Sequence, residues 1–207
     1  MTTGAPAGID PRPRDYRFVL PPDWWRIGLD DTVRARDVDR LVRHQFAGLD
    51  DQPLARRNVT AELLRRADLA ASSGGIDLYL SMMRRADVVV PASLLVTYTP
   101  PPDGGVPDLA SLADVLAVSE TAQVRTSEVA QAGTGPAIRR LAYVIEETEV
   151  GDGPPLQTPS VALDWHLPVP AGEGALLTLS FASPLVVLED SLVELFDTIV
   201  ATTTWVW

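Results

Sequence analysis

Apolar residues recur along this sequence at two spacings, and each spacing predicts a different kind of element. Apolar positions three and four residues apart predict helices over 32–48 and 53–72, a short helix after Asp108, and a terminal helix beginning near Leu188. Pro53 suits the first turn of a helix, where its missing N–H leaves no hydrogen bond unmade. The terminal helix has the clearest apolar stripe, which comprises Leu188, Leu192, Leu195, Phe196 and Ile199.

Alternation of apolar and polar residues predicts the strands. Segments 76–83 and 88–99 predict an antiparallel hairpin. Short turns rich in Gly and Pro separate the later strands, so these strands are expected to pair antiparallel as well. Residues 23–25, which follow two prolines, are expected in a turn. The other expected strands cover 16–20, 122–130, 138–149, 161–167 and 175–181.

This order of elements predicts an α+β fold, in which helices cover one or both faces of an antiparallel β-sheet. The C-terminal amphipathic helix is expected to pack on the sheet through its apolar stripe. Residues 1–14 are rich in Gly, Ala, Pro and Arg, and they are expected to form a disordered tail. Residues 15–207 show no repeat and no break in composition, which predicts a single domain.

The charge of the chain is acidic and unevenly distributed. The 207 residues carry 28 acids and 17 bases, a net charge of −11, and no cysteine. All the bases are Arg and the last is Arg140, so residues 141–207 hold ten acids and no base. This acidity disfavours nucleic-acid binding, and the missing thiols exclude disulfides and thiolate metal sites. No apolar run is long enough for a membrane span, and residues 1–10 lack signal-peptide features, which predicts a cytoplasmic protein.

No residue pattern predicts catalysis or cofactor chemistry. His44 and His166 lack a second ligand at metal-binding spacing, and both are expected at the surface or at a helix end. Segments 72–75 and 133–135 are rich in Gly but lack the lysine of a phosphate loop, so they are expected to be turns. Carboxylates within 146–149 lie near a strand end, where a solvated rim is the usual arrangement. We therefore expect a protein without catalytic residues, cofactor or metal.

Tryptophans and acids are the candidates for contact with another protein. Trp24 and Trp205 are expected in the core, which leaves Trp25 and Trp207 for a partner, because Trp is frequent among interface hot spots. Acids at the start of the terminal helix suit a partner of positive charge. These acids are Glu189, Asp190 and Glu194. The Arg residues within 32–72 alternate with acids, which favours a salt-bridged surface over a nucleic-acid site.

Both ends of the sequence resemble one family. The segments LLTLSFASP (176–184) and LVELFDTIV (192–200), followed by Trp205, are similar to the ending of the LpqN-type proteins of actinobacteria. In that family a strand ends in a Phe-Ser-Thr-Pro-like turn, and a helix with a Leu-Phe-Asp-x-Ile core and a terminal Trp follows. The segment FVLPPDW (18–24) is similar to the Val-Pro-Leu-Pro-x-x-Trp opening of the family.

The resemblance covers residues 16–27 and 161–207, and the middle of the chain matches only in the order of its elements. It implies the PsbP-like fold, an antiparallel sheet between helices, which the family shares with the Ran-binding Mog protein and the photosystem II subunit PsbP. It also implies roles in binding or assembly rather than catalysis. This chain lacks the lipobox Cys of the family and has additional helices within 32–72, so export and lipid anchoring are not carried over.

These features lead to two hypotheses about function. The first is a non-enzymatic protein-interaction module, an accessory or chaperone-like factor, for which a secretion or toxin–immunity locus is one setting. The alternative is a small-molecule or lipid-head-group binding protein that uses a cleft between the sheet and the helices. A pocket with converging polar groups would favour the alternative, and a flat or apolar exposed patch would favour the first hypothesis.

Overall fold

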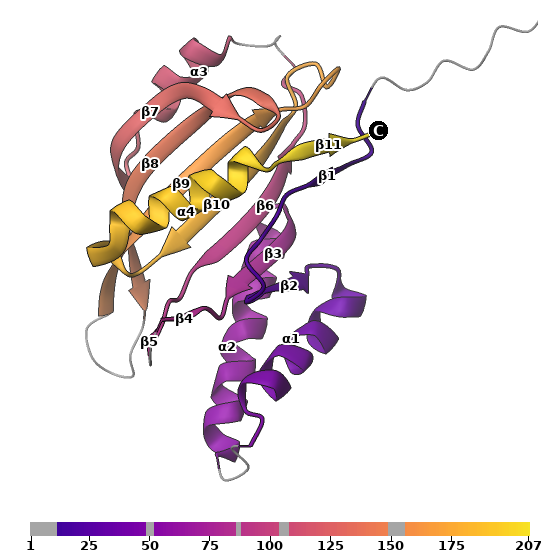
Figure 1. Ribbon diagram of the computed structural model, residues 1–207, viewed down its shortest axis with the longest axis vertical. Helices are drawn as coiled ribbons and strands as arrows, with labels where there is room; N and C mark the ends of the chain where they lie inside the picture. Colours follow the sequence, from indigo (N-terminus) through magenta and orange to yellow (C-terminus); the bar gives the residue numbers. More distant parts are fainter. Residues whose placement is uncertain (1–11, 49–51, 86–87, 104–107, 149–155) are drawn as a thin grey trace, which may run out of the picture.

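A seven-stranded antiparallel sheet forms the centre of the molecule (Figure 1). The computed structural model describes residues 12–48, 52–85, 88–103, 108–148 and 156–207. The architecture is α+β with an antiparallel sheet, as the sequence predicts. In spatial order the strands are β2 (Trp24–Gly28), β3 (Gly75–Ser81), β6 (Ser93–Thr99), β10 (Leu176–Ser183), β9 (Leu156–Pro168), β8 (Gly135–Thr148) and β7 (Ala122–Ala132).

The C-terminal helix α4 (Glu189–Ala201) lies across one face of this sheet, which we call the α4 face (Figure 1). A short 3-10 turn, η1 (Val186–Leu188), leads into the helix. The rings of Phe181 on β10 and Phe196 on α4 stack with their centroids 4.7 Å apart, and both side chains are buried. The predicted packing of the terminal helix on the sheet is therefore confirmed. The helix contributes Leu192, Phe196, Ile199 and Val200 to the main core.

The opposite face, which we call the α2 face, is covered near its two edges. Helices α1 (Asp31–Gln45) and α2 (Pro53–Ser72) pack against β2 and β3. Helix α3 (Leu109–Leu116) packs against β7 and β8, where the Ser127 hydroxyl donates to the Ala113 carbonyl (2.7 Å). The two helix groups thus stand over opposite edges of the sheet, and the cleft described below lies beside α2.

Helix boundaries agree with their sequence signals. The Asp30 side chain accepts a hydrogen bond from the Thr32 N–H (2.8 Å), and Asp108 accepts one from the Ser111 N–H (3.0 Å). Each satisfies a backbone donor that the first helical turn leaves unpaired. Pro53 begins α2, as predicted. In the described part of the chain, no helix has the length and apolar character needed to cross a lipid bilayer.

The structure differs from the sequence predictions at the N-terminus. Trp24 and Trp25 were expected in a turn, and that prediction is wrong, because both lie in the edge strand β2. The strand expected over 16–20 is shorter, and β1 (Asp15–Arg17) pairs with β11 (Thr204–Val206) rather than with the sheet.

The N-terminal tail is described only from residue 12 onward. Residues 1–11 of the tail expected over 1–14 lie outside the described residues. Arg12 donates through Nε to the Ala171 carbonyl (3.3 Å), and the Arg14 N–H donates to the Val206 carbonyl (2.8 Å). The end of the expected tail is thus bonded to the C-terminal part of the chain. Two further strands, β4 (Arg84–Arg85) and β5 (Val88–Val89), form a small hairpin.

Candidate functional site

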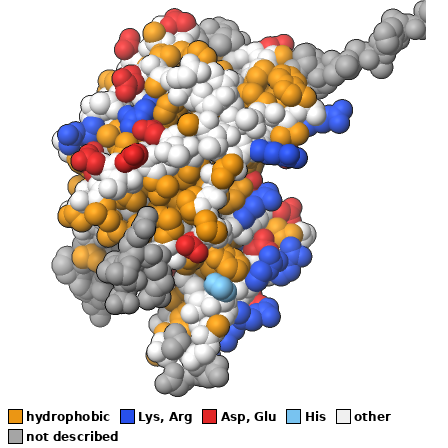
Figure 2. Space-filling model, viewed as in Figure 1, with side chains coloured by type: hydrophobic (Ala, Val, Ile, Leu, Met, Phe, Trp, Pro, Cys, Tyr) orange, Lys and Arg blue, Asp and Glu red, His pale blue; other side chains and the backbone are white. Residues whose placement is uncertain are grey.

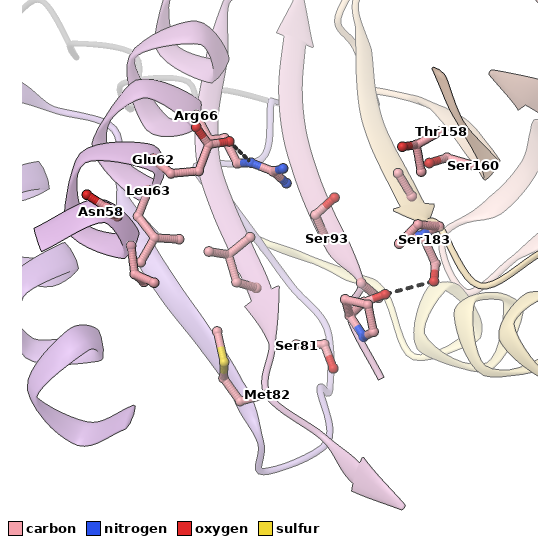
Figure 3. Close-up of a pocket in the computed structure, with 16 residues that line it drawn as sticks. Asn58, Glu62, Leu63, Arg66, Ser81, Met82, Ser93, Thr158, Ser160 and Ser183 are labelled. Carbon is pink, nitrogen blue, oxygen red and sulfur yellow. Dashed lines mark hydrogen bonds and ion pairs between the residues drawn. The ribbon is translucent and has the colours of Figure 1, made fainter. Parts of the chain in front are cut away.

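A cleft of about 590 Å³ opens between α2 and the sheet on the α2 face (Figure 3). Ligand pockets in proteins commonly have volumes of roughly 300–1,000 Å³. We call it the α2 cleft. It is lined by Asn58, Val59, Glu62, Leu63, Arg66, Leu80, Ser81, Met82, Pro91, Ala92, Ser93, Thr158, Ser160, Ala182, Ser183 and Pro184.

The floor of the cleft is low because its strands present small side chains next to one another. In the strand register Ser93 of β6 faces Ala182 of β10, and Ala182 in turn faces Ala162 of β9. Neighbouring strands lie about 4.8 Å apart, so these positions form a continuous row across the sheet. The row continues to Ala142 of β8. With no large side chain rising from this row, space remains between α2 and the strands.

Helix α2 forms the wall of the cleft with side chains that recur along one face. Asn58, Glu62 and Arg66 are spaced four residues apart and therefore project in the same direction. Glu62 accepts hydrogen bonds from Arg65 (2.8 and 2.9 Å) and from the Arg66 Nε (2.7 Å). These charged donors lower the pKa of Glu62 to about 2. The wall therefore carries an ionised carboxylate that is bonded to two guanidinium groups at neutral pH.

The hydroxyl groups of the cleft fall into two classes. Ser81 donates to the Val90 carbonyl (3.1 Å), and Ser183 donates to the Pro91 carbonyl (2.7 Å), so both hold the backbone at one end of the cleft. Ser160 is only 3% exposed, yet its hydroxyl makes no hydrogen bond to any described residue. In Figure 3 the hydroxyls of Ser160 and Thr158 point into the cleft. The Ser160 hydroxyl is therefore available to a bound molecule.

A second polar cluster lies on the same face, outside the cleft lining. Arg140 bonds to the Asp164 carboxylate (3.0 Å) and to the Leu116 carbonyl (2.9 Å). His166 was expected at the surface, but its ring is largely buried, and Nδ1 lies 3.0 Å from the Thr178 hydroxyl. Nε2 is buried without a partner in the described part of the chain. The expectation was wrong because the His166 ring packs beside Thr178 of β10, near Asp164 and Arg140, and these neighbours exclude water from Nε2.

Burial lowers the pKa of His166 below its usual value. Asp164 acts in the opposite direction and Arg140 in the same direction, and desolvation is the largest of the three effects. The unfolded chain therefore binds more protons as the pH falls below about 6.5, and the free energy of unfolding should decrease there. We expect His166→Asn, which keeps an acceptor for Thr178 but cannot titrate, to weaken this pH dependence. Urea unfolding at pH 7 and pH 5 measures it.

His44→Asn is the matched control, because His44 is exposed on α1. This variant should retain the pH dependence of the unmodified protein. Equal pH dependence in His166→Asn and the unmodified protein would show that other groups take up the protons.

No known family model and no curated protein sequence matches this chain. Function therefore has to be inferred from the chemistry of the cleft and the surface. In the described residues, no three His, Asp or Glu side chains gather as a metal site would require.

The residues proposed for protein contact lie outside the α2 cleft and in separate places. Trp25 is half-buried on β2, with its ring centroid 4.8 Å from that of His44. Trp207 follows β11 and is 65% exposed. Glu189 accepts a hydrogen bond from the Tyr143 hydroxyl. The remaining two candidates, both exposed on the N-terminal half of α4, are Asp190 and Glu194.

The Arg-rich helix pair has the salt-bridged surface that the sequence predicts. Figure 2 shows basic and acidic side chains interspersed along α1. Arg34 bonds to Asp68 (2.5 Å) as well as to Asp31 (2.9 Å), and Arg43 bonds to Asp39. The Arg43–Asp39 pair is exposed, and exposed pairs contribute little to stability, whereas the Arg34 side chain is only 15% exposed.

Proposed function

We propose that this protein is a non-enzymatic binding protein that holds a small molecule with an apolar body in the α2 cleft. The observation that carries the proposal is the composition of the cleft, where apolar side chains and hydroxyl groups face the same space. Ligand sites in proteins typically combine an apolar lining with a few polar groups that orient the ligand. The apolar part of the lining includes Val59, Leu63, Leu80 and Met82.

The titratable groups of the lining support binding rather than catalysis. Glu62 and Arg66 are the charged residues that line the cleft, and the pKa of Glu62 is lowered to about 2. A general acid or base works best with a pKa near the operating pH. An ionised carboxylate held by two guanidinium groups is poorly suited to exchange a proton at neutral pH.

We also propose that the fold is PsbP-like and that the chain is related to the LpqN-type family. An antiparallel sheet with helices on both faces and a terminal helix in the core supports this assignment. Phe181 and Phe196 belong to the segments that carry the resemblance, and their rings stack in the core. Binding or assembly, the roles that the resemblance implies, agrees with a ligand-binding cleft.

Protein interaction is the second candidate function. The observation that favours it is an exposed apolar residue near exposed acids, because Val187 is 89% exposed and lies about one turn before Asp190 and two turns before Glu194. In Figure 2 hydrophobic side chains gather below α4 on this face of the molecule. A basic partner could use this surface while the α2 cleft on the opposite face holds a ligand.

Filling the cleft should abolish binding of an apolar probe. Ala182 lies on the floor, so Ala182→Trp is expected to occupy the space that the ligand needs. The probe is the neutral dye N-phenyl-1-naphthylamine, whose fluorescence rises in an apolar site. We expect one dye per protein and a loss of at least tenfold in affinity for Ala182→Trp.

Thr99→Trp is the matched control, because Thr99 is an exposed residue at the far end of β6. It should bind the dye as the unmodified protein does, and near-ultraviolet circular dichroism confirms that both variants are folded. Unchanged dye binding by a folded Ala182→Trp variant would place the dye outside the cleft and contradict the proposal.

A further inference from the structure

We propose that the α2 cleft selects molecules that carry an anionic head group, a carboxylate or a phosphate, on an apolar body, and that Arg66 binds this head group. This inference rests on the proposed function and specifies its ligand. The head group would lie between Arg66 on α2 and the hydroxyls of the sheet, and the apolar body would lie along Leu63, Leu80 and Met82.

The charge balance of the cleft is the first argument. The chain as a whole has a net charge of −11, but the cleft carries one acid and one base in its lining. Glu62 accepts hydrogen bonds from both Arg65 and Arg66 (2.7–2.9 Å), so its negative charge is shared between two guanidinium groups. An acidic protein thus presents no excess of negative charge along the lining of this cleft.

The orientation of Arg66 is the second argument. Its Nε donates to Glu62 (2.7 Å), while its terminal nitrogens make no bond to another described residue. In Figure 3 the guanidinium points from α2 toward Ser93 on β6, and both residues line the cleft. A guanidinium with free terminal N–H groups matches the two oxygens of a carboxylate or a phosphate. Glu62 holds the side chain in this position.

The hydroxyl of Ser160 is the third and independent argument. It makes no hydrogen bond to a described residue, so it is free to donate to a bound molecule. Ser160 is 3% exposed and its hydroxyl points into the cleft, as does that of Thr158 (Figure 3). A hydroxyl donates readily to an anionic oxygen. The floor therefore offers donors opposite the wall that carries Arg66.

Titration calorimetry with four probes tests the inference. The probes are sodium octanoate, octyl phosphate, 1-octanol and inorganic phosphate. A hydrogen bond to a charged group is worth about tenfold or more in affinity. We therefore expect octanoate and octyl phosphate to bind at least tenfold more tightly than octanol. Inorganic phosphate, which has no apolar body, should bind more weakly than octyl phosphate.

Variants of α2 should change the affinity for anions in opposite directions. Arg66→Gln should remove the preference for octanoate over octanol, and Arg66→Lys should restore part of it. Glu62→Gln should bind octanoate several-fold more tightly, because the positive charge then lacks its counter-charge. A merely structural role of this pair would not produce a gain in one variant and a loss in the other. Arg57→Gln, on the same helix but outside the cleft lining, is the control and should bind as the unmodified protein does.

The outcomes separate the two proposals. Equal binding of octanoate and octanol, unaffected by Arg66→Gln, would overturn the anionic head group and leave apolar binding in the cleft intact. Inorganic phosphate that binds as tightly as octyl phosphate would show an anion site that ignores the apolar body. If neither the four probes nor the naphthylamine dye binds, both proposals fail.

Discussion

Replacing Phe196 by Ala is expected to lower the free energy of unfolding by about 3–5 kcal/mol, the usual cost of truncating a buried Phe. Phe196 is fully buried, and its ring stacks on Phe181 of β10 with 4.7 Å between centroids. The substitution leaves a cavity at the contact between α4 and the sheet. Small proteins have total stabilities of only about 5–15 kcal/mol, so a large part of the stability would be lost. Urea unfolding at 25 °C measures the change.

Val187→Ala is the control for this experiment. Val187 is 89% exposed just before α4, and substitutions at such sites usually change stability by less than about 0.5 kcal/mol. The loss of stability for Phe196→Leu should lie between those of Phe196→Ala and Val187→Ala, because Leu keeps most of the buried apolar volume. A loss below about 1 kcal/mol for Phe196→Ala would contradict the central place of this residue in the core.

The helices were predictable because their signals are local. A 3.6-residue apolar period, Pro53 at the start of α2 and Asp108 before α3 are each visible within a few residues of sequence. The terminal helix was predicted from its apolar stripe, and the structure buries that stripe through residues such as Leu192 and Phe196. Local hydrogen bonds and one buried face suffice to define such elements.

The tryptophan pair shows why strand prediction failed at the N-terminus. Two adjacent large apolar residues do not alternate, which argues against a strand with one buried face. The sheet has helices on both faces, so Trp24 packs in the core of the α4 face and Trp25 packs against the helices of the α2 face. Consecutive apolar residues are expected in a strand that is covered on both sides. The pairing of β1 with β11 joins the two ends of the chain and has no local signal.

A cleft between the sheet and the helices was one of the two hypotheses, but its lining residues were missed because they depend on strand register between distant segments. Ser93 and Ala182 are 89 positions apart in the sequence, and only the pairing of β6 with β10 makes them neighbours. One weak signal was present. Thr158, Ser160 and Ala162 supply small side chains at alternate positions of a strand, which indicates a face without bulky packing.

Residues 141–207 contain ten acids and no base, yet some of these acids form ion pairs inside the fold. Arg139 and Arg140, the last two bases, lie next to each other on β8 and therefore face opposite sides of the sheet. Arg140 pairs with Asp164 on the α2 face, and Arg139 pairs with Asp197 of α4 on the α4 face. Two acids of this unbalanced segment, Asp164 and Asp197, thus form ion pairs with Arg residues of the sheet, whereas others such as Asp190 and Glu194 are exposed.

Removing the carboxylate of Asp197 is expected to cost about 2–3 kcal/mol, since it leaves the Trp165 N–H without its acceptor and Arg139 with only the more distant Glu128 carboxylate (3.8 Å). Asp197 accepts hydrogen bonds from Arg139 (3.0–3.2 Å) and from the indole N–H of Trp165 (2.9 Å). The Arg139 side chain is 15% exposed and Trp165 is 3% exposed. Urea unfolding of Asp197→Ala measures the loss.

Two variants separate the roles of Asp197. Asp190→Ala on the same helix removes an exposed acid and should change stability by less than about 0.5 kcal/mol. Asp197→Asn can still accept a hydrogen bond from Trp165 but loses the ion pair. Its loss of stability should therefore lie between those of Asp197→Ala and Asp190→Ala. Equal stability of Asp197→Ala and Asp190→Ala would mean that the charge pair does not fasten α4 to the sheet. If Asp197→Ala loses the most stability and Asp190→Ala the least, Asp197 stabilises the fold. Asp190 and Glu194 then remain as the acids of α4 that are available to a partner protein.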